Sequence, residues 1–331
     1  MGACCTFNNN EVMHEIKPQD TRFYEIFLNP KATLHITKVQ ARIKTYLHYK
    51  YTPQYTIPKF TITSSKSIVN QVETKHGPFF NLFNTPVIEN GRQWKNPTSL
   101  GGGILYEGYY KNNMRDGIGA QIWEDGSKYE GYWKNDKTNG KGRLIHADGD
   151  VYIGDFVDDR TNGNGKYIHF DGAIYEGQWV DDKQQGFGIE KWSDGAKYQG
   201  LYFEGKKHGK GKFEWSDGAT YEGDFANNDI EGIGEYRWPD LRLYKGEWKE
   251  NKMHGKGLFT WQDGRKYVGD YLCDKKHGFG IFTWPDGRKY EGEWVNGKQH
   301  GKGRYINTKK EEIIGTWKEG KKTSWEKPQI I

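Results

Sequence analysis

The chain has 331 residues, of which only 34% are hydrophobic, although 15% are aromatic and 44 are glycine. This composition excludes an ordinary globular core of Leu, Ile and Val, and it favours a glycine-rich β architecture whose apolar surface comes from Trp, Tyr and Phe. Residues 1–105 carry 12 Lys and Arg against 6 Asp and Glu, whereas residues 106–331 carry 37 against 38, so the near-neutral second part argues against a nucleic-acid-binding protein.

Cysteine usage and hydropathy both favour the cytoplasmic side of the cell. Cys4 and Cys5 are adjacent and Cys273 stands alone, so no disulfide framework is predicted and a reducing compartment is the default. No apolar run approaches the roughly 20 residues that span a bilayer. Residues 8–20 are polar where a secretory signal would need an apolar core.

Residues 1–28 begin with the sequence MGACCT and continue as a polar lead. The start fits the N-myristoylation pattern, with Gly2 exposed after removal of the methionine and Thr6 at the required place. Cys4 and Cys5 would supply palmitoylation, because one myristoyl chain holds a membrane only marginally and a second chain makes residence stable. Lipidation at Gly2, Cys4 and Cys5 is therefore predicted, with a membrane as partner; the alternative is an unmodified terminus with two free thiols.

Residues 29–51 are predicted to form a basic amphipathic helix. Asn29 and Pro30 are typical of a helix start, because proline fits the first helical position. Apolar side chains recur at helical spacing, mostly on one face, with five Lys and Arg around them. The apolar positions are Leu34, Ile36, Val39, Ile43, Tyr46 and Leu47.

Within this helix, the sequence VQARIKTYLHYK (39–50) resembles the IQ motif, which binds calmodulin and related light chains. Thr45 departs from the motif because it replaces the usual glycine, and the second basic residue lies one place late. The resemblance implies calmodulin as a partner, while packing on a neighbouring element and contact with an anionic membrane stay open. The matching positions are Val39, Gln40, Ile43, Lys44, Tyr46 and Lys50.

Residues 52–103 are predicted to be an irregular, proline-rich linker. Five prolines interrupt any long element, and three consecutive glycines (101–103) lead into the repeats. Apolar side chains in the linker suggest an extended segment that docks in part on the first repeats. These side chains are Phe79, Phe80, Leu82, Phe83 and Trp94.

Residues 104–325 form a repeat array with a period of 23 residues, followed by a tail at 326–331. In each unit a glycine lies two residues after a tyrosine and an aromatic residue lies four after it. A G-x-G pair follows, and most units then add an aromatic residue and Asp-Gly. Nine gapless copies exclude chance and indicate a stacked-repeat architecture. The tyrosines are Tyr106, Tyr129, Tyr152, Tyr175, Tyr198, Tyr221, Tyr244, Tyr267 and Tyr290.

Each unit is predicted to be a β-hairpin, as the unit that starts at Tyr267 illustrates. Tyr267, Gly269 and Tyr271 alternate with period two, so they point to one face. The sequence CDKKH is expected to be a polar hairpin loop, and Asp286-Gly287 a two-residue turn in which both residues can take a positive φ. The strand glycines leave room for neighbouring rings to lie over bare backbone, which explains glycine in a strand.

This pattern resembles the MORN repeat (membrane occupation and recognition nexus). Tyr290-Glu-Gly-Glu-Trp294 and Trp284-Pro-Asp-Gly287 are close to its consensus, and the resemblance covers nine units. It implies a mainly β fold, namely an elongated single-layer antiparallel sheet of stacked hairpins. It implies no enzymatic activity for the repeats, and it points to cytoskeletal or ciliary assemblies, because radial-spoke proteins of the axoneme carry such arrays.

Two departures from the repeat carry structural predictions. Asp240-Leu241 replaces Asp-Gly in the sixth unit, so that turn should differ from the others. The ninth unit lacks its tryptophan, and residues 313–317 follow in register as a tenth half-unit without the tyrosine. The polar residues up to Trp325 are expected to cap the open edge of the array.

No catalytic or metal chemistry is predicted. His208, His254, His277 and His300 share one loop position, but neighbours would lie about 10 Å apart because each repeat adds two strand spacings, whereas ligands of one ion lie about 2 Å from it. The many G-K-G triplets belong to the repeat and lack the spacing of a phosphate loop. We therefore expect a protein that is not an enzyme, with no catalytic residues, no metal and no cofactor.

The aromatic face of the array is predicted to be the working surface, because a one-layer sheet cannot cover both of its sides. A helix or an extended peptide of a partner protein is expected to dock there, and the alternative is that the rings mostly pack against one another. The predicted docking residues are Tyr129, Trp133, Tyr175, Trp179, Tyr221, Trp248, Tyr267 and Trp294.

These observations favour a non-enzymatic scaffold or adaptor in a membrane-associated cytoskeletal or ciliary assembly. One alternative is a phospholipid-binding tether, which the neutral charge of the array disfavours. A calmodulin-responsive adaptor is another, and a regulatory fragment of an enzyme ranks last. A homodimer is a further option, and nucleic acid is not expected as a partner.

Overall fold

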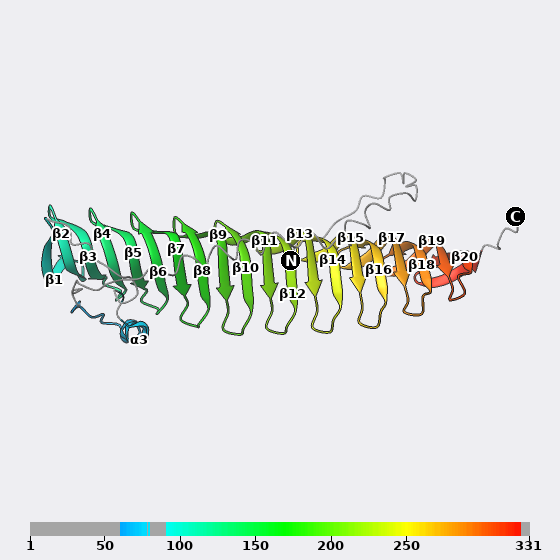
Figure 1. Cartoon of the computed structure of the whole chain (residues 1–331), viewed down its shortest axis with the longest axis horizontal. Helices are drawn as coiled ribbons and strands as arrows, with labels where there is room; N and C mark the ends of the chain where they lie inside the picture. Colours follow the sequence, from blue (N-terminus) through cyan, green and yellow to red (C-terminus); the bar gives the residue numbers. More distant parts are fainter. Residues whose placement is uncertain (1–59, 78, 80–90, 326–331) are drawn as a thin grey trace, which may run out of the picture. The chain divides into compact units, whose positions relative to one another are not determined.

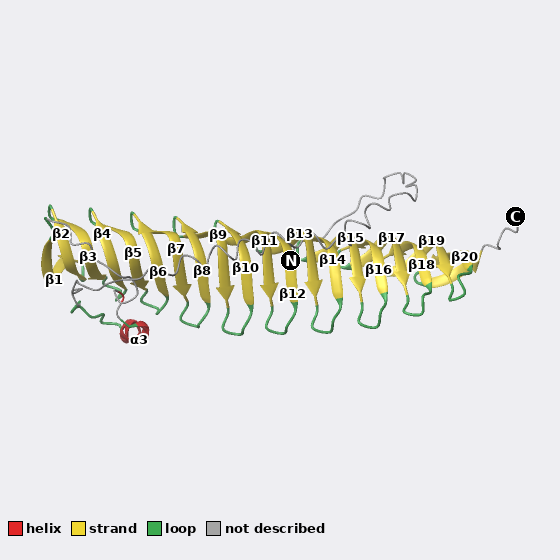
Figure 2. Ribbon diagram, viewed as in Figure 1, coloured by secondary structure: helices red, strands yellow, loops and turns green. Residues whose placement is uncertain are grey.

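The computed structural model describes residues 60–77, 79 and 91–325 (Figures 1 and 2). The chain divides into two compact units, Met1–Thr52 and Pro53–Ile331, and the described residues all belong to the second. The predicted lipidation sites Gly2, Cys4 and Cys5 and the IQ-like helix at 29–51 lie outside the described residues. The same holds for Phe80, Leu82 and Phe83 of the linker.

In its described part the chain forms one helix and 21 strands (Figure 2). The helix is α3 (Ser67–His76). The strands are β1 (Gln93–Gly101), β2 (Ile104–Lys111), β3 (Met114–Ile122), β4 (Lys128–Lys134), β5 (Lys137–Ile145), β6 (Val151–Val157), β7 (Arg160–Ile168), β8 (Ile174–Val180), β9 (Lys183–Lys191), β10 (Lys197–Phe203), β11 (Lys206–Glu214), β12 (Thr220–Ala226), β13 (Asp229–Arg237), β14 (Leu243–Lys249), β15 (Lys252–Thr260), β16 (Lys266–Leu272), β17 (Lys275–Thr283), β18 (Lys289–Val295), β19 (Lys298–Ile306), β20 (Glu312–Lys318) and β21 (Lys321–Trp325).

The strands form a single antiparallel sheet in which each strand pairs with its neighbours in the sequence, from β1 to β21 (Figure 1). Each repeat contributes two strands, so the period of 23 residues is the length of one hairpin with its connection. The sheet is open, with β1 and β21 at its two edges among the described residues. The predicted mainly β fold of stacked hairpins in one layer is confirmed.

Two kinds of turn join the strands, and their chemistry differs from the prediction. At the hairpin end, Cys273 and Asp274 form a two-residue turn with positive φ at both positions (48° and 67°). At the other end, Asp286-Gly287 belongs to a longer connection in which only the glycine has a positive φ, of 89°. The predicted two-residue Asp-Gly turn is therefore wrong, because the type of turn that needs two left-handed residues lies at the opposite end of the strands.

The hairpin turns also hold neighbouring repeats together. The second turn residue, such as Asp159, donates its backbone N–H to the carbonyl of Thr138 in the preceding hairpin at 3.1 Å. Its side-chain oxygen accepts the backbone N–H of the same threonine at 2.7 Å. Asp and Asn tolerate the left-handed region and offer this acceptor, which explains why they recur at a position where glycine would only satisfy the backbone.

A continuous row of glycines crosses the middle of the sheet. Gly177 faces Gly188 across one strand pair and Gly165 across the other, and the pattern repeats along the array. A Cβ atom added at Gly188 would lie 2.5 Å from Oη and Cε2 of Tyr175. The prediction that each ring packs over bare backbone is therefore confirmed.

The ring of Tyr175 lies flat in this space and its hydroxyl donates to the carbonyl of Gln178 at 3.0 Å. Burial raises the pKa of this hydroxyl. The nine repeat tyrosines are at most 1% exposed and make the same bond to the carbonyl three residues later. Buried hydroxyls without such a partner would cost free energy, so this bond is part of the repeat.

The repeat tyrosines and the aromatic residues four positions later form what we call the inner aromatic row. Tyr175 contacts Trp179 of its own unit and Tyr202 of the next, with ring centroids 5.2 and 5.1 Å apart and planes nearly perpendicular. The same alternation continues from Tyr110 to Trp317. Edge-to-face packing of this kind stabilises a core beyond the area it buries. The row is therefore the hydrophobic core of a sheet whose tyrosine face no second layer of described residues covers.

The region before the repeats is more ordered than predicted. Residues 67–76 form α3, and residues 93–101 form β1, which pairs with β2 and extends the sheet by one strand. The prediction of an irregular linker missed both elements. Pro97 lies in β1 at the register shift between Lys95 and Thr98. An edge strand tolerates proline because the N–H groups on its free side have no strand to pair with.

Residues 60–77 and 79, which we call the docked segment, pack on the sheet face opposite the tyrosines. Val69 and Val72 of α3 pack on Ile145 and Val151 of β5 and β6. Phe79 is 1% exposed and contacts Ile118. The predicted docking through Phe79 is confirmed, and Trp94 contributes from β1, where its ring stacks on Phe60 at 5.9 Å.

Buried charges fix the docked segment to the sheet. Glu130 binds Arg143 at 2.6 Å and Lys128 at 3.0 Å. Lys128 also pairs with Glu73 of α3 at 2.6 Å, and Arg143 donates to the carbonyl of Gly77 at 2.7 Å. Each charge has a partner, so burial of Lys128, Glu130 and Arg143 is compensated, while Glu73 lies at the edge of the cluster with its side chain 26% exposed.

The predictions for the two irregular repeats, the sixth and the ninth, have different outcomes. Leu241 adopts a φ of 67°, and its turn keeps the backbone bonds of the other turns, with Trp238 and Arg242 in the usual roles. The predicted change of this turn is therefore wrong. At the far end, β20 is in register as the tenth half-unit, with Gly315 opposite Gly303, and β21 closes the array as the predicted capping segment.

Candidate functional site

The eight predicted docking residues lie together in the inner aromatic row but are nearly inaccessible. Their exposed fractions run from 0% for Tyr129 to 8% for Trp179. Trp179 uses even its indole N–H internally, since it donates to the carbonyl of Gly165 at 3.3 Å. These rings mainly pack against one another, so a partner on this face would meet other side chains first. Docking on the eight residues stays a prediction.

A second line of rings flanks the inner row on the same face, and we call it the outer aromatic row. Phe213 lies opposite Tyr221 in the strand pairing and therefore points to the tyrosine face, as does Trp215 two residues later. The connections with Asp-Gly begin at this second ring. The outer aromatic row consists of Trp192, Phe213, Trp215, Tyr236, Trp238, Phe259, Trp261, Phe282, Trp284 and Tyr305.

The outer aromatic row is a continuous apolar strip in which Phe259 and Phe282 are buried and the other rings are partly exposed. Successive centroids are 4.4–6.2 Å apart, and the planes are mostly stacked or tilted. Its tryptophans are partly exposed and pack on the inner row with one side. An exposed apolar strip of this length is typical of a surface that receives a partner.

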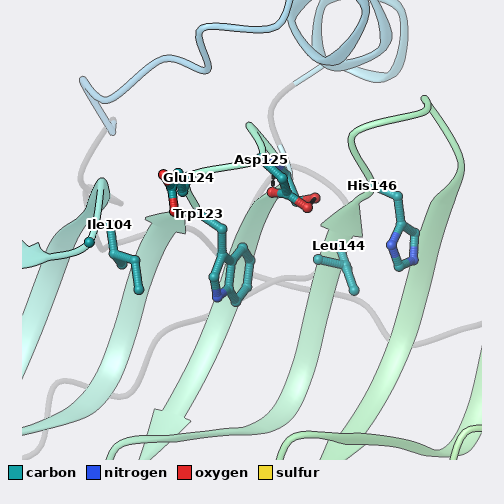
Figure 3. A pocket seen from close by; sticks show the side chains of 8 residues that line it. Ile104, Trp123, Glu124, Asp125, Leu144 and His146 are labelled. Atoms are coloured by element: carbon teal, nitrogen blue, oxygen red, sulfur yellow. Dashed lines mark hydrogen bonds between the residues drawn. The ribbon is translucent and has the colours of Figure 1, made fainter.

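The strip ends toward the first repeats, where smaller or polar side chains replace the rings. Leu144 and His146 stand where later repeats have Phe213 and Trp215. An open hollow of about 690 Å³ results, and Trp123, Glu124 and other side chains line it. Figure 3 shows Trp123 between Ile104 and Leu144, with the carboxyl groups at the connection that follows β3.

Charged side chains lie over aromatic rings at one repeat position, which is occupied by Arg115, Lys207, Lys276 and Lys322 in different repeats. In one of them, the Nζ atom of Lys207 lies 4.8 Å from the ring of Trp192 and 3.0 Å from Oε2 of Glu190. The hydroxyl of Tyr202 donates to the same carboxylate oxygen at 2.9 Å. Glu190 occupies a position that is aromatic in most later repeats, so here a carboxylate replaces a ring and neutralises the lysine.

Another of these side chains is Lys276, three repeats after Lys207. Its Nζ atom lies 4.5 Å from the ring centroid of Phe282, 4.6 Å from that of Trp294 and 5.2 Å from those of Trp261 and Tyr267. Burial, together with the nearby Arg265, lowers the pKa of Lys276 to about 8. The cation is therefore held in a cage of aromatic rings at the border between the inner and outer rows.

The repeated histidines lie on the opposite face of the sheet. His254, His277 and His300 face Glu247, Asp270 and Glu293 across their hairpins. The described residues contain no group of three or more His, Cys, Asp or Glu side chains placed to hold a metal ion. In the same part of the chain, no helix is long and apolar enough to cross a membrane.

Sequence reasoning missed the outer aromatic row and both caged lysines. The sequence did indicate the row, because Phe213 and Trp215 are two residues apart and therefore share a face of the strand. The strand register places Phe213 opposite Tyr221 and so on the tyrosine face. There was no such indication in the sequence for Lys207 and Lys276, which resemble ordinary charged loop residues. Only the strand pairing places them over aromatic rings. Their different partners among the described residues, Glu190 for Lys207 and aromatic rings for Lys276, depend on contacts between neighbouring repeats.

Comparison with solved structures finds many chains of low similarity. The TCP10 domain of Danio rerio CPAP is 10% identical, with 62% of this chain and 98% of that chain covered and a TM-score of 0.35. The TCP10c domain of Drosophila melanogaster Sas-4 is 11% identical, with 46% and 90% covered and a TM-score of 0.27. These values are too low to carry an argument, and no curated protein matches the sequence.

A family model gives the specific result. The MORN-repeat model matches nine consecutive segments, which together take up more than half of the chain. They are residues 106–128, 129–151, 152–174, 175–197, 198–220, 221–240, 244–264, 267–287 and 290–309. The matches start at the nine tyrosines of the inner aromatic row, and the sixth ends just before Leu241. The chain therefore belongs to the MORN-repeat family.

Proposed function

We propose that the protein is a non-enzymatic scaffold whose tyrosine face docks a helix or an extended peptide of a partner protein. The observation that supports this most directly is the outer aromatic row, a continuous and partly exposed apolar strip that no second layer covers in the described part of the chain. MORN repeats are modules that bind proteins or associate with membranes. A rigid row of rings offers contact area at little cost in conformational entropy.

Residues before the array supply the rest of the proposal. Acyl chains on Gly2, Cys4 and Cys5 would hold the scaffold at a membrane, and the IQ-like helix at 29–51 would bind calmodulin or a similar light chain. The support for both is the sequence alone. Together with the family resemblance, they favour a membrane-associated cytoskeletal or ciliary assembly, with the axoneme as the location to examine first.

The docking proposal is tested by removing rings from the outer aromatic row. In a Trp238→Gln/Trp261→Gln variant, we expect the set of proteins that co-purify from the native cell to fall at least tenfold in amount, because the apolar strip is interrupted at its centre. Quantitative mass spectrometry measures the change, and circular dichroism checks that the sheet is retained.

A matched variant on the opposite face controls for general effects. Ile233 and Phe279 are each 52% exposed there, and Ile233→Gln/Phe279→Gln removes comparable apolar surface. Its partners should stay at the wild-type level. The proposal fails if the partners are kept by the tryptophan variant while its sheet is intact, or if only the opposite-face variant loses them.

The membrane part has a separate test. Gly2→Ala blocks myristoylation, so it should move the protein from the membrane fraction to the soluble fraction. Unchanged partition would remove acylation as the anchor, and binding of residues 104–325 alone to anionic liposomes would favour the phospholipid-binding alternative.

A further inference from the structure

Lys276 and Lys207 occupy the same position in repeats 69 residues apart, and their surroundings can be compared directly. The rings around them correspond, with Trp192 and Tyr198 at one site replaced by Trp261 and Tyr267 at the other. One position differs in charge. Where the first site has Glu190, the second has Phe259, which is aromatic and 7% exposed.

The first site shows what this arrangement binds. The carboxylate of Glu190 receives both the ammonium of Lys207 and the hydroxyl of Tyr202, two donors that converge on one oxygen. The corresponding donors at the second site are Lys276 and Tyr271. Within the described residues neither has a carboxylate or another side-chain acceptor, although Tyr271 is 5% exposed.

The described part of the chain therefore offers no counter-charge to Lys276. The nearby cation Arg265 is already paired with Asp263 at 2.7 Å and lies 5.2 Å from the ring of Trp261. Lys276 is mostly buried but keeps some solvent exposure, so an acceptor can reach it from solvent across the outer aromatic row. A partly desolvated ammonium gains more from a counter-charge than a fully hydrated one does.

We infer that Lys276 is the polar anchor of the docking face and that it binds an Asp or Glu side chain of the partner. The partner segment is then apolar where it lies on the outer aromatic row and carries one acidic residue opposite the cage. Glu190 is the internal example of the contact, and the partner supplies in trans what that residue supplies in cis. This inference rests on the proposed function, because it specifies the chemistry of the segment that docks.

The experiment uses the full-length protein with ¹³C-labelled lysine and hexanoate as the probe, since hexanoate joins a carboxylate to an apolar chain. The Cε resonance of Lys276, assigned by its loss in Lys276→Met, should titrate well below the usual pH of a lysine. Hexanoate should raise the midpoint of that titration by about 1 pH unit, which is a tenfold gain in proton affinity. Hexanol, with the same chain and no charge, should leave it in place.

The repeat offers two reciprocal variants. Phe259→Glu supplies the carboxylate that Lys207 already has, so the midpoint of Lys276 should rise without hexanoate and stop responding to it. Glu190→Phe removes that carboxylate from the first site, so Lys207 should acquire a lowered midpoint and a hexanoate response. A Lys276 resonance that ignores hexanoate, or responds no more than the other lysines, overturns the inference.

Failure of this inference and failure of the proposed function give different results. If the partners depend on Trp238 and Trp261 but bind Lys276→Gln as strongly as the wild type, the docking face stands and the acidic anchor is wrong. If hexanoate binds as described while the tryptophan variant keeps its partners, the carboxylate site stands and the proposed function is wrong.

Discussion

Leu241 is the residue at which the repeat departs most from its own rule. Seven connections between repeats carry glycine at this position, with φ near 90°, and Leu241 adopts a φ of 67° in the same turn. Left-handed backbone costs a residue with a Cβ atom roughly 1–2 kcal/mol. The side chain is 68% exposed, so it recovers little by packing.

We therefore predict that Leu241→Gly stabilises the protein. The gain should be about 1 kcal/mol, because relief of the left-handed strain exceeds the added flexibility that glycine gives the unfolded chain. Thermal unfolding followed by circular dichroism measures the change, and hydrogen exchange at residues 238–242 localises it.

The reverse exchange in the preceding repeat is the control. Gly218 has a φ of 91°, and a Cβ atom there would meet nothing within 4 Å. Gly218→Leu should therefore destabilise by about 1 kcal/mol through backbone strain alone. If both variants were as stable as the wild type, the residue type at this turn position would not affect stability, and the prediction would be wrong.

At the scale of elements, the docked segment depends on charges buried beneath it. Burial by itself would raise the pKa of Glu130, but Lys128 and Arg143 beside it hold that pKa below its ordinary value. A carboxyl whose pKa is lower in the folded state stabilises the fold above its unfolded pKa, near 4.5, and the contribution is lost as the pH falls through the folded value.

Docking of the segment should therefore weaken as the pH falls below 4.5 and through the lower pKa of Glu130 in the folded state, while the sheet persists. The methyl groups of Val69 and Val72 report this directly, because they pack on Ile145 and Val151. We expect their NMR shifts to move toward unstructured values as the pH falls.

The Glu130→Gln variant tests whether Glu130, and not another carboxyl group, causes the acid transition. The variant leaves Arg143 and Lys128 buried with one partner fewer, so docking should already be weaker by about 3 kcal/mol at neutral pH. The acid transition of the valine methyls should disappear with it. A transition that persists unchanged in the variant would assign the effect to a different group, such as Glu73.

At the scale of the whole molecule, the sheet is a one-dimensional stack in which each repeat contacts only its neighbours. The stability of such an array is close to a sum of repeat and interface terms. The rows of glycines and rings continue across every junction with the same register, as the pairs Gly211–Gly223 and Gly234–Gly246 show. Whole repeats should therefore be removable.

Deletion of residues 221–243 joins Thr220 to Tyr244 and restores every row. We expect a folded sheet with two strands fewer and a lower unfolding midpoint, because one set of neighbour contacts is lost. Deletion of residues 221–242, which is one residue shorter, moves every following side chain to the other face and should unfold the array. Circular dichroism and thermal melts compare the two, and similar behaviour of both would refute the fixed register.

The sequence by itself determined the sheet. The spacing of Tyr267, Gly269 and Tyr271 within one strand fixes which side chains share a face, and the exact repetition fixes how neighbouring units pair. This information is local and periodic, so it was sufficient for the fold class, for the glycine spaces under the rings and for the register of the half-unit at Gly315.

The tertiary structure alone decided which of these rings remain accessible and what covers the opposite face. The inner aromatic row is buried because each ring is enclosed by the units before and after it, and this shifts the candidate docking surface to the outer aromatic row. Docking of α3 rests on contacts such as Lys128 with Glu73, which are 55 residues apart in the chain. Contacts at that separation, like the exchange of Glu190 for Phe259 beside a caged lysine, follow no period, so only the folded chain shows them.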